Sequence, residues 1–176
     1  MLGHDADETH PAYLNWDHPG VRPALRRAEL PPGEPLLLIS PYGPPKVRAV
    51  KKGRKLYLWD WSSVEHDGPC FENLVASQLL KYCHWVEDTE GYSTELRYLR
   101  DTDKREVDFV VLKERKPLFA VECKSGEKAV SPAIRYFAER TPIPHFYQVH
   151  ARERHFSTGN ATVLPFIRFC QELELP

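Results

Sequence analysis

Long apolar runs are missing from this sequence of 176 residues. No stretch approaches the roughly 18 consecutive apolar residues of a membrane-spanning helix, and the start, MLGHDADETHP, has neither the basic residues nor the apolar core of a signal peptide. An excess of charge of one sign is missing too, because the formal net charge is −1. We therefore expect no membrane partner, and the overall charge does not by itself indicate a nucleic-acid partner.

Common metal-binding and nucleotide-binding motifs are also absent. Cys70, Cys83, Cys123 and Cys170 form no CxxC pair, and no paired histidine motif accompanies them. This spacing favours reduced thiols in a cytoplasmic protein over a zinc site or a disulfide framework. The GxxxxGK[ST] loop that binds phosphates in many ATPases is absent as well, because the nearest match, KKGRK at 51–55, lacks the upstream glycine and the Ser or Thr.

What is present is the composition of a globular domain. Hydrophobic residues make up 41% of the chain and charged residues 28%, which is typical of one soluble domain. Nine of the sixteen prolines lie in residues 1–45, and this disfavours long helices and central strands there. We predict that 1–45 is an appendage or linker with one short helix near Val21–Arg27 and one strand at Leu36–Ser40, followed by the folded domain at 46–176.

A basic segment, KVRAVKKGRK (46–55), opens that domain. It contains six basic residues in ten and no acidic residue. With the LYLWD that follows, it predicts two short strands joined by a turn at Lys51–Lys55. Such a run is more often a solvated edge strand or loop than a binding site, so it gives only weak support for a nucleic-acid partner.

Helical and strand patterns then alternate along the chain. Apolar residues recur at helical spacing after Gly68 and Pro69, three closely spaced apolar segments predict antiparallel hairpins, and Ser131 with Pro132 forms an N-cap and first-turn pair. The predicted elements are a helix at 71–86, strands at 94–100, 106–113 and 117–124, a helix from Ser131 to about Glu139, a strand at 145–151 and a helix from about Pro165. This order predicts an α/β fold with a mixed sheet.

Charged residues interrupt two of these strands, at Asp108 in EVDFVVLK and at Glu122 and Lys124 in PLFAVECK. Because side chains alternate along a strand, Glu122 and Lys124 point to one face, and a short loop brings Asp108 alongside Glu122. Neighbouring carboxylates repel each other unless positive charge lies between them, and Mg²⁺ or Mn²⁺ binds one or two carboxylates of this kind. An ordinary ion pair with exposed tips is the alternative, and on spacing alone it is the more common arrangement.

A longer pattern connects these residues. Glu72 lies near the start of the first helix, Asp108 near the start of a strand, and the triplet ECK (122–124) begins fourteen residues later. In the order αβββαβ, this pattern resembles the restriction-endonuclease-like PD-(D/E)xK phosphodiesterase superfamily. The phrases KLYLWD, FENLVASQLL, LRYLRDTDKREVDFVV and AVECKSG are similar to the C-terminal domain of a large prokaryotic group of predicted AAA+ ATPases, over roughly 41–126. One position departs from the superfamily pattern, because Val107 stands where a proline is usual.

The resemblance implies a restriction-endonuclease-like core with a central mixed sheet flanked by helices. It implies that Asp108 and Glu122 bind Mg²⁺ or Mn²⁺ and that Lys124 positions the attacking water. It further implies that Glu72 binds a second metal ion or orients a water molecule at the metal, and that Gln148 lies near these residues.

The resemblance also implies partners. Nucleic acid is the expected substrate, with DNA expected before RNA. A homodimer is compatible with the resemblance because many nucleases of the superfamily are dimers, but the sequence does not determine the oligomeric state. The ATPase half of the family is not in this chain, so an AAA+ ATPase module is an expected partner and the chain is either a fragment or a stand-alone domain. We interpret LRRAELPPGEPLLLISPYGPP (25–45) as the truncated end of a winged-helix-like linker.

Two functions are compatible with this pattern. The first is metal-dependent hydrolysis of phosphodiesters in nucleic acid. The alternative is a catalytically inactive nuclease-fold module that binds nucleic acid or docks an ATPase, since a fold does not determine a function. Carboxylates that converge around an open position support the first function, whereas an ion pair of Asp108 with Arg100 or Arg105 and no cavity supports the second.

Overall fold

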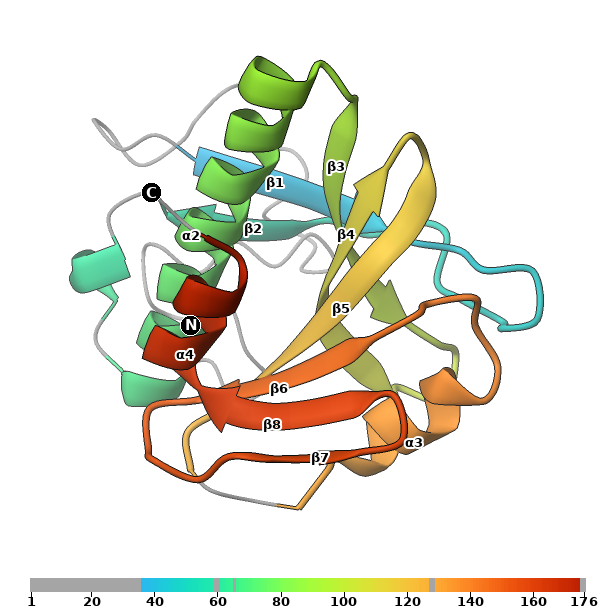
Figure 1. Cartoon of the computed structure of the whole chain (residues 1–176). Helices are drawn as coiled ribbons and strands as arrows, with labels where there is room; N and C mark the ends of the chain where they lie inside the picture. The colour runs from blue at the N-terminus through green and yellow to red at the C-terminus, as the bar shows by residue number, and fades with distance from the viewer. Residues whose placement is uncertain (1–35, 59–60, 65, 127–128, 175–176) are drawn as a thin grey trace.

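One mixed β-sheet of eight strands organises the described part of the chain (Figure 1). The structure is a computed structural model that describes residues 36–58, 61–64, 66–126 and 129–174. Its strands are β1 (Leu36–Pro41), β2 (Lys55–Leu58), β3 (Thr94–Arg100), β4 (Glu106–Lys113), β5 (Lys116–Lys124), β6 (Phe146–His150), β7 (Phe156–Thr158) and β8 (Ala161–Pro165). Its helices are α2 (Asp67–Glu90), α3 (Pro132–Ala138), α4 (Phe166–Glu172) and the short 3-10 helix η1 (Trp61–Ser63).

The strands are arranged in the order β2-β1-β3-β4-β5-β6-β8-β7. At the centre, β3, β4 and β5 form an antiparallel meander. The pairs β1–β3, β5–β6 and β6–β8 are parallel, and the sheet ends in the antiparallel pairs β1–β2 and β7–β8. The predicted α/β fold with a mixed sheet is therefore confirmed.

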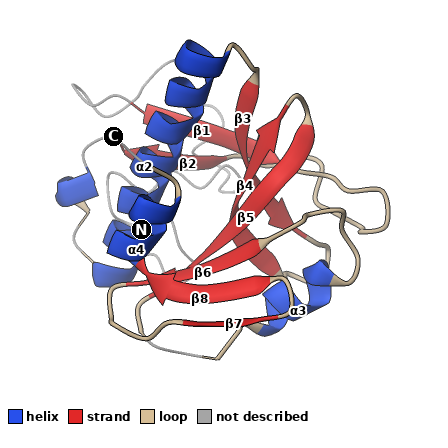
Figure 2. Cartoon of the chain, viewed as in Figure 1, coloured by secondary structure: helices blue, strands red, loops and turns tan. Residues whose placement is uncertain are grey.

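The sheet is covered by helices on both faces (Figure 2). On one face, α2 and α4 pack over apolar residues of the central strands and touch each other through Phe71 and Phe166, whose ring centroids are 5.8 Å apart. On the other face, α3 contributes Ile134 and Phe137 to a second core. Both faces of β4 and β5 are thus buried, which agrees with their nearly continuous apolar runs.

Helix α2 is longer than its apolar periodicity predicted. It begins at Asp67 and includes Gly68 and Pro69, which we had expected to precede it. A proline is compatible with the first turn of a helix because the backbone N–H groups there have no partner within the helix. The helix ends at Glu90 and is capped by Gly91, whose φ of 73° is left-handed and whose N–H donates to the carbonyl oxygen of Glu87.

One other expectation about strands was wrong, and two strands were not expected. Residues 46–54 form no strand beyond a single bridge between Ala49 and Asp101, so the expected hairpin around Lys51–Lys55 is absent. Instead β2 pairs with β1, whose LLLISP sequence supplies an apolar partner. Strands β7 and β8 were not predicted at all. The expected helix near Val21–Arg27 lies outside the described residues.

Strand β1 belongs to the proline-rich segment 1–45 but is hydrogen-bonded to both β2 and β3 in the sheet. The helix expected from Ser131 is confirmed as α3, and the Ser131 side chain accepts a hydrogen bond from the N–H of Ile134 as its N-cap.

Among the described residues, no helix combines the length and the apolar character that crossing a bilayer requires.

Candidate active site

A β-bulge in β4 turns Asp108 toward the sheet face that α2 covers. The register between β3 and β4 shifts between Arg97 and Leu99, so that β4 holds one residue more than β3 over this stretch. Two consecutive side chains, those of Asp108 and Phe109, can then lie on the same face. Phe109 packs in the core beneath α2, and Asp108 Oδ1 lies 3.4 Å from Nζ of Lys55.

Asp108 also continues the contact between β4 and β5 beyond the point where their backbone pairing stops. The ladder ends at Phe109↔Val121. Beyond it, Oδ2 of Asp108 accepts a hydrogen bond of 2.8 Å from the backbone N–H of Cys123. The carboxylate therefore lies against the peptide bond that joins Glu122 to Cys123.

Glu122 is a buried carboxylate with one oxygen in an ion pair and one oxygen without a donor. The residue is only 5% exposed. Its Oε1 accepts a hydrogen bond from Nζ of Lys124, so the two side chains share one face as predicted. Its Oε2 is buried and has no hydrogen-bond partner within the described part of the chain. A buried acceptor of this kind is costly unless a ligand satisfies it.

Glu72 reaches the site from the first turns of α2. Its Oε1 accepts hydrogen bonds from the hydroxyl of Tyr57 at 2.7 Å and from Nζ of Lys55 at 3.2 Å. The neighbouring residue fixes the helix in this position: Asn73 Oδ1 accepts the N–H of Leu58 at 3.0 Å, and its amide donates to the Leu58 carbonyl. The side chain of Asn73 thus binds the end of β2 as a paired strand would.

Lys55 lies among three carboxylates. Its Nζ is 2.5 Å from Glu106 Oε1, 3.2 Å from Glu72 Oε1 and 3.4 Å from Asp108 Oδ1, and its side chain is only 14% exposed. We refer to Glu72, Glu106, Asp108 and Glu122 as the acidic cluster.

Two carboxylates of the acidic cluster have raised pKa values. Burial, followed by the negative charge of Asp108, raises the pKa of Glu72 to about 7 and that of Glu122 to about 8. Lys55 and Lys124 lower these two pKa values but do not restore them to the ordinary range. The pKa of Lys55 itself is raised, because Glu106 and Glu72 outweigh the opposite effect of burial. A further positive charge close to either carboxylate would lower its pKa.

Asp108 forms its ion pair with Lys55 and not with Arg100 or Arg105. Arg100 Nε lies 3.5 Å from Glu106 Oε2, and Arg105 Nε lies 2.8 Å from Asp101 Oδ2. Asp108 is thus held by a cation, but by a lysine and not by one of these arginines.

Sequence reasoning missed three members of this site, Lys55, Tyr57 and Glu106. Five of the six basic residues in 46–55 are exposed, and Lys55 is the exception. The local signal was the alternation in KLYL, which places Lys55 and Tyr57 on one side of β2. That signal gave no information about which carboxylates the two side chains would meet.

Gln148 lies beside Glu122, because the two residues are in register in the parallel pair β5–β6. Its side chain is fully buried and binds backbone groups ahead of α3: Oε1 accepts the N–H of Ser131 at 2.8 Å, and the amide donates to the carbonyl of Ala129 at 3.2 Å. The sequence placed this residue correctly near the site, and these bonds give it a positioning role for the segment before α3.

Two carboxylate oxygens of this region are of the kind that magnesium and manganese bind. Within the described ranges, no group of three or more His, Cys, Asp or Glu side chains has the arrangement of a metal site. Mg²⁺ commonly takes only one or two carboxylates and fills its other positions with water and phosphate. Asp108 Oδ1 and the unpaired Oε2 of Glu122 are oxygens of that kind.

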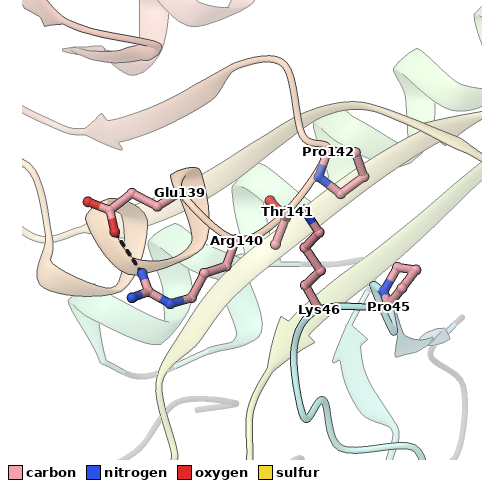
Figure 3. Close-up of a pocket in the computed structure, with 6 residues that line it drawn as sticks. All are labelled: Pro45, Lys46, Glu139, Arg140, Thr141 and Pro142. Atoms are coloured by element: carbon pink, nitrogen blue, oxygen red, sulfur yellow. Dashed lines mark hydrogen bonds and ion pairs between the residues drawn. The ribbon is translucent and has the colours of Figure 1, made fainter.

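A pocket lies in another part of the molecule (Figure 3). Its volume is about 280 Å³, and it is lined by Pro45, Lys46, Glu139, Arg140, Thr141 and Pro142. No residue of the acidic cluster lines it, so this pocket is not the open position that the first hypothesis requires.

Comparison with protein-family models matches residues 67–169 to a family described as a domain of unknown function, DUF4143. The matched range contains all four members of the acidic cluster and Lys124, whereas Lys55 and Tyr57 precede it. Neither the curated proteins nor the solved structures gave a significant match. Because the matched range covers more than half of the 176 residues, the chain belongs to the DUF4143 family.

Proposed function

We propose that this domain hydrolyses phosphodiester bonds in nucleic acid with the help of a bound Mg²⁺ or Mn²⁺ ion. The observation that carries the proposal is the buried Oε2 of Glu122, which has no donor among the described residues and belongs to the strand end against which Asp108 is held. A carboxylate oxygen in this state is destabilising unless a cation or donor reaches it. The resemblance to the PD-(D/E)xK pattern suggests the reaction class.

Asp108 and Glu122 are the residues that we expect to hold the ion. Such an ion, when bound, polarises a phosphodiester and lowers the pKa of the water that attacks it. The protein keeps both carboxylates in place: Asp108 accepts the N–H of Cys123, and Glu122 is paired with Lys124.

Lys124 is the residue that we assign to the attacking water. Its side chain is 30% exposed, so its ammonium group is accessible to a substrate while the ion pair with Glu122 restricts its position. Burial lowers the pKa of Lys124, but the charge of Glu122 outweighs this effect and the net shift is upward. The ammonium group therefore stays charged, and it can orient a water molecule and balance negative charge on the phosphate.

We propose that the substrate is nucleic acid, and that it is DNA before RNA. The segment before β2 exposes five basic side chains next to the strand that carries Lys55. Exposed lysine and arginine side chains supply the phosphate contacts on which most nucleic-acid affinity depends. These exposed residues are Lys46, Arg48, Lys51, Lys52 and Arg54.

The test is a cleavage assay of the full chain on a panel of labelled substrates. Single-stranded, double-stranded and branched DNA and RNA would each be incubated in Mn²⁺, in Mg²⁺ and in EDTA, alongside the Asp108→Ala variant. We expect metal-dependent cleavage of at least one substrate that the variant loses. Cleavage that persists in EDTA, or that the variant retains, would contradict the proposal.

A second function is favoured by one observation. The ammonium group of Lys55 already supplies positive charge to three carboxylates of the acidic cluster, which is how a site without metal could be stabilised. On this account the domain is an inactive nuclease-fold module that binds nucleic acid or docks an AAA+ ATPase partner. Fluorescence anisotropy in EDTA measures the binding of nucleic acid, and the cleavage assay measures its hydrolysis. Binding in EDTA together with no cleavage in Mg²⁺ or Mn²⁺ would support the module.

A further inference from the structure

Two carboxylates of the acidic cluster are already supplied with donors. Glu106 is paired through both oxygens, with Lys55 Nζ at 2.5 Å from Oε1 and Arg100 Nε at 3.5 Å from Oε2. Glu72 Oε1 accepts hydrogen bonds from both Lys55 and Tyr57. A metal ion on this side of the cluster would have to displace the ammonium group of Lys55.

The other two carboxylates are held less closely by Lys55. Asp108 accepts the backbone N–H of Cys123 on Oδ2, and its Oδ1 is 3.4 Å from Lys55 Nζ, the longest of the three contacts of that ammonium group. Glu122 Oε2 is buried without a partner in the described ranges. Lys55 therefore binds Glu72 and Glu106 more closely than Asp108, and Glu122 keeps an oxygen without a donor in the described ranges.

The charge of Lys55 agrees with this difference. Its ammonium group already places one positive charge against Glu72, Glu106 and Asp108. A divalent ion bound between Glu72 and Glu106 would lie next to this ammonium group, and the repulsion between the two cations is unfavourable in a partly buried site.

We propose that the ammonium group of Lys55 occupies the place of a second metal ion. The site then takes one divalent ion, at Asp108 and Glu122, and Glu72 is a positioning residue for Lys55 instead of a metal ligand. This inference rests on the proposed metal site and specifies its stoichiometry.

The test counts Mn²⁺ ions bound to the full chain by the loss of the free Mn²⁺ signal in electron paramagnetic resonance. Wild type is expected to bind one ion and Lys55→Met two, because that change leaves Glu72 and Glu106 without their ammonium group. Lys113→Met is the matched control, since Lys113 pairs with Glu90 at the surface, and it is expected to bind one ion. Two ions in wild type, or one ion in a folded Lys55→Met variant, would overturn the inference.

A second variant keeps the test valid if Lys55→Met does not fold. Glu72→Gln retains an acceptor for Tyr57 and removes one negative charge, so it is expected to fold. We expect it to bind one Mn²⁺ with a Kd within about threefold of wild type, which allows for the lost long-range attraction. Loss of the ion, or a Kd weaker by about tenfold or more, would show that Glu72 is a ligand and would overturn the inference.

Failure of the inference can be told apart from failure of the proposed function. If wild type binds no Mn²⁺ and Lys55→Met binds one ion, Lys55 does stand in for a metal ion, but the proposed metal site at Asp108 and Glu122 is wrong. If the ion counts are one and two and no substrate is cleaved, the inference stands and the nuclease function does not. If wild type binds two ions and cleaves, the function stands and the inference is overturned.

Discussion

Asp108 on β4 accepts a hydrogen bond of 2.8 Å from the backbone N–H of Cys123 on β5, one residue beyond Glu122. A single side chain thereby joins two central strands where their backbone ladder has ended, and it brings a second carboxylate to the strand end that holds Glu122. This hydrogen bond joins the two strands, and it also holds the Asp108 carboxylate at the proposed metal site. Substitutions of Asp108 can separate these two roles.

Asp108→Asn and Asp108→Ala are expected to differ in stability and to agree in activity. Asparagine keeps an oxygen that can accept the Cys123 N–H, whereas alanine leaves that N–H without its partner. We expect Asp108→Ala to lose about 1–3 kcal/mol of unfolding free energy in urea titrations, and Asp108→Asn to lose clearly less. Both variants are expected to lose metal-dependent cleavage, because neither retains the carboxylate. Equal stability of the two variants would show that the hydrogen bond contributes nothing.

The stability of the protein in EDTA is expected to fall as the pH rises from 5.5 to 8. Burial and the charge of Asp108 raise the pKa of Glu122 to about 8, well above the ordinary value of 4.5 that applies to the unfolded chain. The folded state therefore binds a proton at Glu122 more tightly than the unfolded chain does. The stabilisation that this proton gives the folded state is complete below pH 4.5 and is lost as the pH rises through 8. Glu122 alone accounts for a loss of about 2–3 kcal/mol of unfolding free energy across this window, and Glu72, whose pKa is raised to about 7, adds to it in the same direction.

Glu122→Gln tests the origin of that slope, because the amide does not ionise. The variant is expected to be more stable than wild type at pH 8 and to show a flatter dependence on pH. Glu90→Gln is the matched control, since Glu90 is 40% exposed and pairs with a surface lysine, and it should keep the wild-type slope. An unchanged slope in Glu122→Gln would mean that another group titrates.

Mn²⁺ is expected to stabilise the folded protein, and more so at pH 8 than at pH 5.5. A ligand at a hundred times its Kd adds about 2.7 kcal/mol to the unfolding free energy, and the ion competes with protons for the carboxylates. Thermal unfolding with Mn²⁺ or EDTA at both pH values measures the effect. The shift should disappear in Glu122→Gln, and a shift of wild-type size in that variant would place the ion elsewhere.

Asn73→Ala is expected to be strongly destabilising although it lies outside the proposed chemistry. Asn73 is fully buried and satisfies both the N–H and the carbonyl of Leu58. Its removal leaves two buried backbone groups without partners, at a cost of about 2–4 kcal/mol. Urea unfolding measures this loss, with His84→Ala on the exposed side of the same helix as a control that should change stability by less than about 0.5 kcal/mol. Equal stability of the two variants would contradict this role of Asn73.

The meander was readable from the sequence because its signals are local. The strands predicted at 94–100 and 106–113 have the same bounds as β3 and β4, since a short charged turn separates two segments of apolar alternation. Strands β7 and β8 were missed for the opposite reason. A strand of three residues shows almost no periodicity, and the turn at Gly159, with its φ of 56°, was the main clue between them.

The candidate site could be predicted only in part. Asp108 lies next to the peptide bond between Glu122 and Cys123 because β4 and β5 form one hairpin, and Glu122 and Lys124 share a face because side chains alternate along a strand. Lys55 is 53 residues from Asp108 along the chain, and its place depends on β2 pairing with β1 instead of forming a hairpin within the basic segment. No local pattern indicates that choice. The bulge that turns Asp108 toward α2 was equally invisible in the sequence.

The central claim is that the Asp108 and Glu122 carboxylates support metal-dependent phosphodiester hydrolysis. The most direct test compares initial rates of DNA cleavage by wild type, Asp108→Asn and the surface control Lys113→Met, in Mn²⁺ and in EDTA. We predict cleavage by wild type and Lys113→Met in Mn²⁺ only, with a rate at least about a hundredfold lower for a folded Asp108→Asn protein. Equal rates for wild type and Asp108→Asn, or undiminished cleavage in EDTA, would contradict the account.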